Sequence, residues 1–516
     1  MKLEYPTFNE AEKHFKWSER WELFDRDRAN LNIAYECVDK HPKDKTAIRL
    51  KNSDGSKETY TFGELSRLAS QFANMLERRG IKPGDRVGIV LNPSLEYYVS
   101  FYGTLKRGAV AVPCYSLLGP EGLMYRLENS KAKVGIISKE RAHIIPTSSI
   151  SEILHSEELI ETIKKEKNDY QTNTSADTLA VIQFSSGTTG QPKQVLYKHE
   201  AMTLTSVYAK FWLGLSESDK YFCTSSPAWG HGIWYGTVAP LVFGTGIGAF
   251  SGKFDAELLL EAFEEFGVTV TSNIPRVYKM IMDCGKIDQF KLNLRRLTYT
   301  GDRCEKEVLE YFQNKLGLYI ASFYGNTEVG PVVFDYAFPD WKPRMGSAGK
   351  PMLGVKLNVL DENGNLLPPG EVGQVAVLRK GEWRGIGDYG YLDEDGFLWP
   401  KGRSDDVIKS SGFRIGPFEI ETVLEKHPAV QNAAVVGSPD KDRGEIVKAF
   451  ITLSPGVEGS EGLVSEIQGF VKTRLSMHEY PKEIEFVNEL PMTPDGKLQR
   501  KILKKMEYDR KGKKLN

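Results

Sequence analysis

Apolar and polar residues follow one another along the first four hundred positions in the pattern of strands separated by helices. The run 86–91 (RVGIVL) predicts a buried strand, and the segment SLEYYVSFYGTLKRG after it has its apolar residues at helical spacing. The runs AVAVPC and KVGII also predict buried strands, and TLAVIQF predicts a strand that continues directly into a polar loop. Strands that are apolar throughout and alternate with helices indicate an α/β fold with largely parallel sheets.

The pattern changes at about residue 354. The segment VKLNVLDENGNLLPPGEVGQVAVL contains two strand-like runs joined by turn-rich sequence, and YLDEDGFLWPKGR predicts a further hairpin, so we expect a small antiparallel, β-barrel-like unit. After a charged break near residue 404, the chain returns to one helical run and two strand-like runs. We therefore predict a large N-terminal domain of α/β subdomains that includes this unit, residues 1–404, and a small α+β C-terminal domain, residues 405–516.

Composition restricts the class of protein without identifying it. A chain of 516 residues is too long for one hydrophobic core. The net charge of −1 gives no broad field for nucleic acid or an acidic membrane, and no apolar run approaches the ~20 residues of a membrane span. The five cysteines have no CxxC spacing and the N-terminus is charged, so we expect no disulfide framework, no zinc site, no signal peptide and a cytoplasmic location.

The polar loop SSGTTGQPKQ, residues 185–194, is the first candidate for chemistry. Small residues let backbone N–H groups and hydroxyls surround an anion, and Lys193 adds a positive charge suited to phosphate. The alternative is a flexible surface loop. A Walker A loop is excluded because Gln191 and Pro192 follow Gly190.

Three further loops imitate known ligand sites only in part. GTGIGA (244–249) fits a dinucleotide fingerprint, but FSGKFD follows it in place of a helix, so we predict a strand and a turn. DENGN and DEDG lack the glycine and glutamate of a calcium loop, so we interpret both as hairpin turns.

Several motifs of this sequence resemble those of a known family and occur in the same order. The loop resembles the [ST]SGTTGxPKG motif of the adenylate-forming superfamily, which contains acyl-CoA synthetases, luciferases and peptide-synthetase adenylation domains. SFYGNTEVG (322–330), the run 387–421 and PMTPDGKLQRK (491–501) are similar to later motifs of that family and occur in the family's order. The likeness extends from YTFGEL at residue 60 to Arg500 and is closest to AMP-forming synthetases of the medium-chain acyl-CoA type.

The resemblance implies a reaction in two halves. A carboxylate attacks the α-phosphate of ATP, which gives an acyl-adenylate and pyrophosphate, and the thiol of coenzyme A then displaces AMP. It implies ATP, Mg²⁺ and coenzyme A as the small molecules of the reaction. Catalysis of the first half depends mainly on positioning and on neutralising charge.

The family's functional residues map onto matching positions of this sequence. Four are implied to be catalytic: Thr188, Lys193, Glu328, which would also hold Mg²⁺, and Lys497, which would reach both the substrate carboxylate and the α-phosphate. The residues implied to bind ATP or AMP are Ser185, Ser186, Gly187, Thr188, Thr189, Gly190, Lys193, Gly301, Asp302, Arg303, Tyr324, Gly325, Asn326, Thr327, Asp388, Arg403 and Arg414. Among these, Tyr324 would stack on adenine, and Asp388 with Arg403 would hold the ribose.

The resemblance also implies that the C-terminal domain is a mobile lid. Lys497 lies in that domain, which must close for adenylation and then rotate about a hinge at Asp405. Gly412 matches the glycine that lines the tunnel for coenzyme A. Two positions depart from the family: Gln194 replaces its usual glycine, and Ile386 replaces the threonine of a TGD motif.

Three positions bear on the acid substrate. Acetate-activating members have a tryptophan where this chain has Gly325, so a larger acid should fit. The segment SSPAWGHGIWYG (225–236) aligns with an aromatic motif of the medium-chain enzymes, which places Trp229 at the acyl pocket. His231 either lines that pocket or is a hydrogen-bonded structural histidine. We predict a medium-chain, alicyclic or aromatic acid.

Other functions stay open at this stage. They are an acetyl- or short-chain-CoA synthetase, an enzyme that loads a carrier protein, and an inactive nucleotide-binding homologue. No carrier domain follows Lys497 and Gly412 leaves the tunnel open, which opposes carrier loading. We expect the partners to be a small carboxylic acid, ATP and coenzyme A, with no nucleic acid and no membrane span. The resemblance is compatible with a homodimer.

Overall fold

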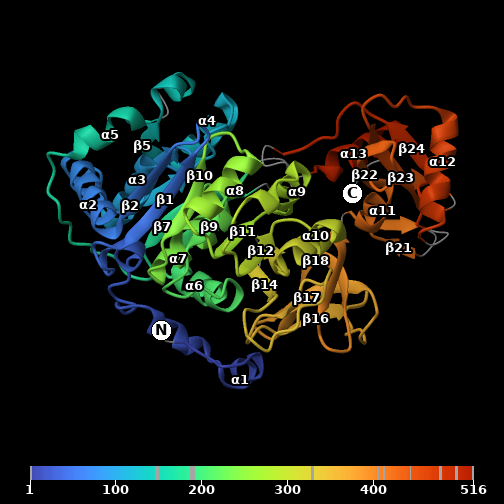
Figure 1. Cartoon of the computed structure of the whole chain (residues 1–516), viewed down its shortest axis with the longest axis horizontal. Helices are drawn as coiled ribbons and strands as arrows, with labels where there is room; N and C mark the ends of the chain where they lie inside the picture. The colour runs from blue at the N-terminus through green and yellow to red at the C-terminus, as the bar shows by residue number, and fades with distance from the viewer. Residues whose placement is uncertain are drawn as a thin grey trace. The chain divides into compact units, whose positions relative to one another are not determined.

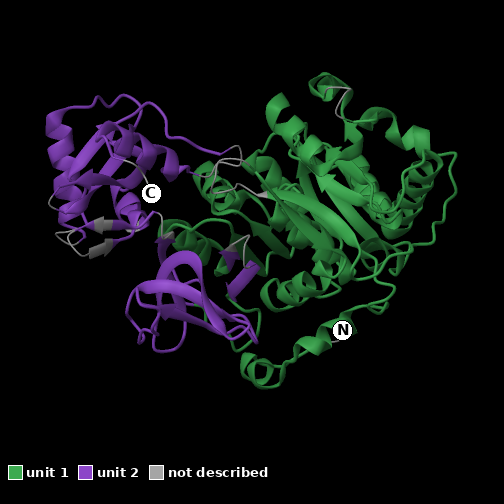
Figure 2. Cartoon of the chain, turned by 180° about the vertical axis from the view of Figure 1, so that it is seen from behind, with its two compact units in different colours: residues 1–323, 334–343 green, residues 324–333, 344–516 purple. Residues whose placement is uncertain are grey.

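The computed structural model describes residues 3–145, 150–185, 192–326, 330–403, 406–410, 413–441, 443–475, 479–493 and 498–513. Contacts between residues divide the chain into two compact units, coloured separately in Figure 2. Unit 1 contains Met1–Phe323 and Phe334–Pro343, and unit 2 contains Tyr324–Val333 and Arg344–Asn516. The boundary at 404/405 stays a prediction, because this division follows contacts and not hinge positions.

The first sheet of unit 1 has six strands in the order β6-β5-β3-β4-β7-β8. They are β3 (Arg86–Val90), β4 (Val110–Pro113), β5 (Ala132–Ile137), β6 (Glu152–His155), β7 (Leu179–Ser185) and β8 (Lys193–Lys198). All neighbours are parallel except β7 and β8, which form an antiparallel hairpin. Helix α3 packs on β3 and β4, and α4 packs on β5. This arrangement confirms the buried strands predicted from the apolar runs.

The second sheet of unit 1 runs in the order β13-β12-β11-β9-β10-β1-β2, from blue to yellow-green in Figure 1, and the short strands β14 (Gly330–Phe334) and then β15 (Lys350–Pro351) continue it beyond β13. Its strands are β1 (Thr46–Asn52), β2 (Lys57–Thr61), β9 (Tyr221–Cys223), β10 (Ile247–Ser251), β11 (Val270–Asn273), β12 (Arg296–Thr300) and β13 (Ile320–Asn326). Of the pairs among these seven strands, β1–β2 alone is antiparallel. The GTGIGA segment leads into β10, which confirms the predicted strand and turn.

The helices of unit 1 connect and cover these strands. They are α1 (Phe8–His14), α2 (Phe62–Arg78), α3 (Leu95–Lys106), α4 (Pro120–Ser130), α5 (Ser156–Ile163), α6 (Ala201–Trp212), α7 (Ala239–Val242), α8 (Ala256–Glu265), α9 (Pro275–Cys284) and α10 (Lys306–Leu316). Short 3₁₀ segments are η1 (Trp17–Leu23), η3 (Lys139–Ile144) and η5 (Ile287–Gln289), and π-helical turns are η2 (Tyr35–Asp39) and η4 (His231–Val238). Helix α2 begins with a capping box between Thr61 and Glu64, which fixes its start directly after β2.

Unit 2 contains two further sheets. The first is antiparallel in the order β16-β17-β18-β19, with β16 (Leu357–Leu360), β17 (Gly373–Arg379), β18 (Glu382–Leu392) and β19 (Leu398–Arg403). The short strands β14 (Gly330–Phe334) and β15 (Lys350–Pro351) precede it in the chain. The two hairpins predicted between residues 355 and 403 are therefore confirmed.

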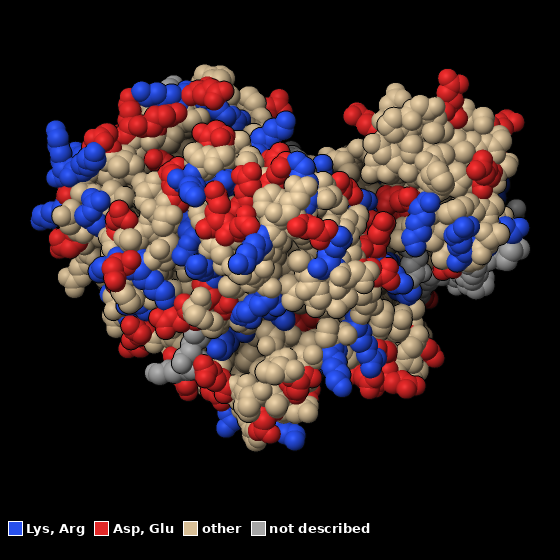
Figure 3. Space-filling model, viewed as in Figure 1, with Lys and Arg blue, Asp and Glu red and all other residues tan. Residues whose placement is uncertain are grey.

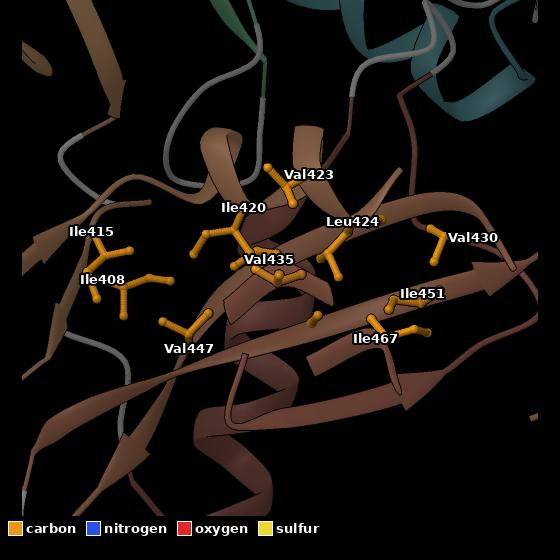
Figure 4. Close-up of a cluster of buried hydrophobic side chains, with 13 residues drawn as sticks. Ile408, Ile415, Ile420, Val423, Leu424, Val430, Val435, Val447, Ile451 and Ile467 are labelled. Carbon is orange, nitrogen blue, oxygen red and sulfur yellow. The ribbon is translucent and has the colours of Figure 1, made fainter. Parts of the chain in front are cut away.

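The C-terminal sheet of unit 2 has the order β21-β20-β23-β22, with β24 parallel to β23. Its elements are β20 (Ile408–Ser410), β21 (Phe413–Ile415), α11 (Pro417–Leu424), β22 (Val430–Asp440), β23 (Gly444–Leu453), α12 (Glu461–Lys472), β24 (Glu483–Phe486) and α13 (Arg500–Arg510). A buried aliphatic cluster drawn in Figure 4 joins α11 and α12 to the sheet, with Ile420, Val435, Val447 and Ile467 among its members. This is the α+β layer expected for the C-terminal region.

Surface and thiol chemistry agree with the composition. Figure 3 shows basic and acidic side chains mixed across the visible face, with no broad region of one sign. All five cysteines are free, and all except Cys284 are buried. Among the residues described above, no helix has the length and apolar character needed to cross a bilayer.

Candidate active site

The carboxyl ends of four parallel strands lie along one edge of the second sheet of unit 1. Strands β9, β11, β12 and β13 are in consecutive parallel register. The first three lead respectively into residue 224, Ile274 and Gly301, and β13 ends at Asn326. Ligands of open parallel sheets bind outside the carboxyl ends of the strands. The predicted residues Trp229, His231 and Gly301 all follow these strand ends in the chain.

His231 opens the π-helical turn η4 and is held from both sides. Its Nδ1 lies 2.8 Å from the Ser225 hydroxyl and its Nε2 lies 2.8 Å from the Ser272 hydroxyl, with 4% of the residue exposed. A neutral imidazole has one donor and one acceptor nitrogen, so one serine accepts and the other donates. Burial lowers the pKa of His231 to about 3. Of the two roles left open by the sequence, the structure shows the hydrogen-bonded one; a place in the acyl pocket stays a prediction.

Trp229 stands between His231 and Gly301. Its ring makes an edge contact with His231, with 5.5 Å between ring centroids, and the indole remains partly exposed. A Cβ at Gly301 would lie 2.7 Å from the indole Cη2, and Gly301 has φ +95°, where L side chains are strained. Glycine is therefore required at residue 301 both by the backbone and by the indole beside it.

The strand that enters the polar loop is bonded to the Trp229 segment. Gln183 on β7 donates through Nε2 to the carbonyl of Ala228 over 3.3 Å. Positions 185 and 193 pair across the hairpin and share the face of β7 that carries Gln183. Lys193 is exposed. The structure thus brings Lys193, the root of the loop and the Trp229 segment onto one side of β7.

Tyr324 and Asp388 come together within unit 2. The tyrosine hydroxyl donates to Oδ2 of Asp388, which is 8% exposed on β18. Asp388 pairs directly with Arg403 across the β18–β19 ladder, so the two predicted ribose residues occupy opposite positions on neighbouring strands. The Tyr324 ring and the Asp388 carboxylate therefore lie together, opposite the backbone position of Arg403.

Two positions near this pair have structural reasons for their residue type. A Cβ at Gly325 would lie 2.3 Å from the carbonyl oxygen of Gly330, so the close approach of these two backbone segments requires glycine. Ile386 replaces the family's threonine and is 4% exposed within the apolar core of the β16–β19 sheet. The departure at 386 therefore adds a core side chain and leaves Asp388 on the ladder.

Ten predicted residues lie outside the described part of the chain: Ser186, Gly187, Thr188, Thr189, Gly190, Thr327, Glu328, Asp405, Gly412 and Lys497. The same holds for the side chains of Ser185, Asn326, Arg403 and Arg414. Asp302 and Arg303 are exposed after Gly301. An isolated antiparallel bridge joins Met492 and Leu498.

Sequence reasoning missed the groups that hold the candidate residues in place. Ser225 and Ser272 clamp His231 but belong to no motif, and their pairing depends on two strands that are distant in sequence. Tyr125 and Asn129 on α4 form hydrogen bonds with Pro192 and Gln194 at the end of the polar loop sequence. The one available signal was Gln194, which departs from the family's glycine.

Comparison with known proteins gives consistent matches over almost the whole chain. The model of the AMP-binding enzyme family matches residues 35–385, and that of the AMP-binding enzyme C-terminal domain matches residues 419–497. The acetyl-coenzyme A synthetase of Bacillus subtilis (strain 168) is 36% identical over 548 aligned positions, which cover 98% of this chain and 95% of that protein. The mitochondrial acyl-coenzyme A synthetase ACSM3 of Rattus norvegicus is 35% identical and covers 93% of this chain and 91% of its own.

A solved structure shows the same architecture. The anthranilate CoA ligase AuaEII in complex with anthranoyl-AMP superimposes with a TM-score of 0.83 at 29% identity, over 96% of this chain and 100% of that one. Together with the family matches, this confirms the α/β fold class with a large N-terminal and a small C-terminal domain.

Proposed function

The chain belongs to the family of AMP-binding enzymes and is an AMP-forming acyl-CoA synthetase, for which we propose a medium-chain, alicyclic or aromatic acid as substrate. In the first half-reaction a carboxylate oxygen forms a bond to the α-phosphorus of ATP, and pyrophosphate leaves. In the second, the sulfur of coenzyme A attacks the acyl carbon, and AMP leaves with the bonding electrons. AMP is needed because a free carboxylate has no leaving group that a thiol could displace.

We assign the first half-reaction to residues of the polar loop, of the segment 322–330 and of the C-terminal domain. Thr188, Thr189 and Lys193 hold the β- and γ-phosphates, and Glu328 would hold Mg²⁺, whose charge would offset that of the phosphates. Lys497 contacts the carboxylate and the α-phosphate, where charge develops. Support comes from Lys193, which lies exposed on the side of β7 that meets the Trp229 segment.

The adenosine end of the nucleotide is assigned to unit 2. Tyr324 stacks on adenine, and Asp388 with Arg403 holds the ribose hydroxyls. The hydrogen bond from Tyr324 to Asp388 and the direct pairing of Asp388 with Arg403 support this assignment, because base and ribose are covalently joined and need adjacent partners.

The observation that carries the acid preference is the glycine at position 325. Acetate-activating members have an indole there, whereas a Cβ in this backbone would already lie 2.3 Å from the Gly330 carbonyl oxygen. Position 325 therefore supplies no wall to an acyl site, and Trp229 becomes its aromatic boundary. The aromatic acid named for the anthranilate CoA ligase is in keeping with such a site.

Acetate is the second candidate acid. It is favoured by the similarity to a protein named acetyl-coenzyme A synthetase, at 36% identity over 98% of this chain. Another side chain would then have to fill the space beside Trp229.

A panel of acids separates the two candidates. AMP release with ATP, Mg²⁺ and coenzyme A would be measured for acetate, butyrate, hexanoate, octanoate, benzoate and cyclohexanecarboxylate. We expect the highest kcat/KM for an acid of six or more carbons or for a ring acid. An optimum at acetate would overturn the proposed preference and leave the synthetase assignment intact.

We also propose the domain boundary at 404/405, with Asp405 as hinge and Gly412 at the coenzyme A tunnel. The gap between the two family matches, from residue 385 to 419, supports a boundary in this interval. A cytoplasmic location is supported by five free cysteines, which are typical of a reducing compartment.

A further inference from the structure

Helix α4 is fastened to the start of strand β8, where the polar loop sequence ends. The hydroxyl of Tyr125 donates to the carbonyl of Pro192 over 3.0 Å, and Nε2 of Gln194 donates to the carbonyl of Asn129 over 2.6 Å. Tyr125 and Asn129 are one helical turn apart, so both lie on the same face of α4. The two bonds therefore fix the same short piece of chain from one side.

The bond from Gln194 uses a carbonyl that the helix itself leaves without a donor. The last four carbonyl groups of an α-helix have no partner within the helix, and Asn129 lies in the final turn of α4. The next carbonyl, that of Ser130, accepts from Nε of Arg86 over 2.7 Å. Gln194 thus completes the C-terminal end of α4 while anchoring strand β8.

Ring contacts add to the two hydrogen bonds. Phe184 lies directly opposite Gln194 in the hairpin, so the two side chains share one face. Tyr125 packs against Phe184 with 6.4 Å between ring centroids, and the Arg126 guanidinium lies 5.6 Å from the same ring. Helix α4 therefore grips the hairpin on the face that carries residues 184 and 194.

The two anchored residues flank Lys193 in the sequence. Pro192 and Gln194 are its two neighbours in the chain, and side chains alternate between the faces of a strand. The Lys193 side chain consequently lies on the face opposite to Gln194, which is the face of Gln183 and of its bond to Ala228. Holding both neighbours against α4 directs the ammonium group away from the helix.

We propose that Tyr125 and Gln194 are positioning residues, which hold Lys193 toward the β- and γ-phosphates of ATP. The proposal rests on the phosphate role of Lys193 in the proposed function. The usual family residue at position 194 is glycine, which has no side-chain donor, so the Gln194 anchor is a property of this chain. It gives a physical reason for the departure at that position.

The half-reactions provide the test. Tyr125→Phe removes one hydroxyl, and Gln194→Met removes one donor at nearly constant length. Leu196→Gln is the matched control, because Leu196 lies on the same strand face and is 59% exposed. Acid-dependent ATP–pyrophosphate exchange would give KM for ATP, pyrophosphate and acid; the reaction of supplied acyl-adenylate with coenzyme A would give the second half alone.

Each single variant should raise KM for ATP and for pyrophosphate by about 3- to 10-fold, the range expected for one lost hydrogen bond. KM for the acid and the rate from acyl-adenylate should stay within about twofold, because the β- and γ-phosphates have left by then. The proposal would be overturned if KM for ATP were unchanged in both variants, or if KM changed equally for ATP, pyrophosphate and acid. A wild-type protein without any exchange activity would overturn the proposed function as well.

Discussion

Tyr324 and Asp388 are separated by 64 positions, and the hydrogen bond between them is a detail that only the folded chain supplies. The tyrosine ring packs against the apolar core of the β16–β19 sheet, and in the proposed function it also stacks on adenine, while its hydroxyl orients the carboxylate. The hydroxyl and the ring thus serve different neighbours, and neither use competes with the other. Phenylalanine at this position would keep the ring but lose the hydroxyl that bonds to Asp388.

In the proposed function, Lys497 is the residue on which we expect the first half-reaction to depend most. Lys497→Ala removes a positive charge from the place where charge develops, so acid-dependent ATP–pyrophosphate exchange should fall by about 100-fold or more. Conversion of supplied acyl-adenylate to acyl-CoA should continue at a similar rate, since the α-phosphate bond to the acyl oxygen already exists. The exchange is measured by incorporation of labelled pyrophosphate into ATP, and the second half-reaction by release of AMP.

Gly412→Leu tests the second half-reaction, as Lys497→Ala tests the first. A side chain in the proposed tunnel should spare pyrophosphate exchange and stop thioester formation. Full exchange activity in Lys497→Ala would refute the lysine assignment, and equal loss of both activities in Gly412→Leu would refute the tunnel.

At the residue scale, sequence motifs located the candidate groups but not their surroundings. Motif order was sufficient to select Asp388 and Arg403, which the structure pairs across one ladder. It could not show that Ser225 and Ser272 hold His231, because that contact depends on how β9 and β11 lie side by side. The motif shows that Gly325 lacks the indole of acetate-activating members. It does not show that the backbone at this position has no room for any side chain.

At the scale of elements, the apolar runs were the most reliable guide. The run 86–91 became β3, the helical spacing after it became α3, and the hairpins after residue 354 became β16–β19. The π-helical turn His231–Val238 was not predicted, because it is buried throughout and has no amphipathic period. Its sequence therefore carries no signal that would separate it from an ordinary buried helix.

The ion pair between Glu421 on α11 and Arg500 at the start of α13 links two helices of unit 2. Arg500 donates to both carboxylate oxygens, over 2.9 and 2.5 Å, and the Val435 amide donates to one of them over 2.7 Å. Arg500→Met should destabilise this region by about 3–5 kcal/mol, since a buried carboxylate loses its guanidinium partner. Amide hydrogen exchange of Val435 should accelerate accordingly.

The double variant Glu421→Leu/Arg500→Met serves as the control. Removing both charges from a buried site should recover much of the lost stability. If the single and double variants exchange at the same accelerated rate, the ion pair is not what holds α11 to α13.

At the scale of the whole molecule, buried histidines make stability depend on pH. Burial lowers the pKa of His199 and His231 to about 3 and that of His41 to about 4. The unfolded chain takes up these protons below its ordinary histidine pKa of about 6.5, whereas the folded chain does not. The free energy of unfolding should therefore fall as the pH drops from 6.5 toward 3, by about 2 kcal/mol per histidine at pH 5.

His199→Asn tests this dependence at one site. Its Nδ1 accepts from the Ile33 amide over 3.0 Å, which an asparagine oxygen can also do. The thermal midpoint of this variant should change less between pH 8 and pH 5 than that of the wild type. The exposed His14→Gln is the control and should keep the wild-type pH dependence; an identical pH slope in His199→Asn would contradict the linkage.

Unit 1 is made of two separate stretches of the chain, and this has a consequence for biosynthesis. The chain leaves unit 1 after Phe323 and re-enters it at Phe334, where Asp335 exchanges hydrogen bonds with Ser322 and Ala337 donates to Phe211. A ribosome adds about 5–20 residues per second, so the stretch from 324 to 343 takes about one to four seconds. During that time β13 lacks its contacts with the segment Phe334–Pro343, which has not yet been synthesised. The larger unit is thus finished only after the first piece of the smaller one has been translated.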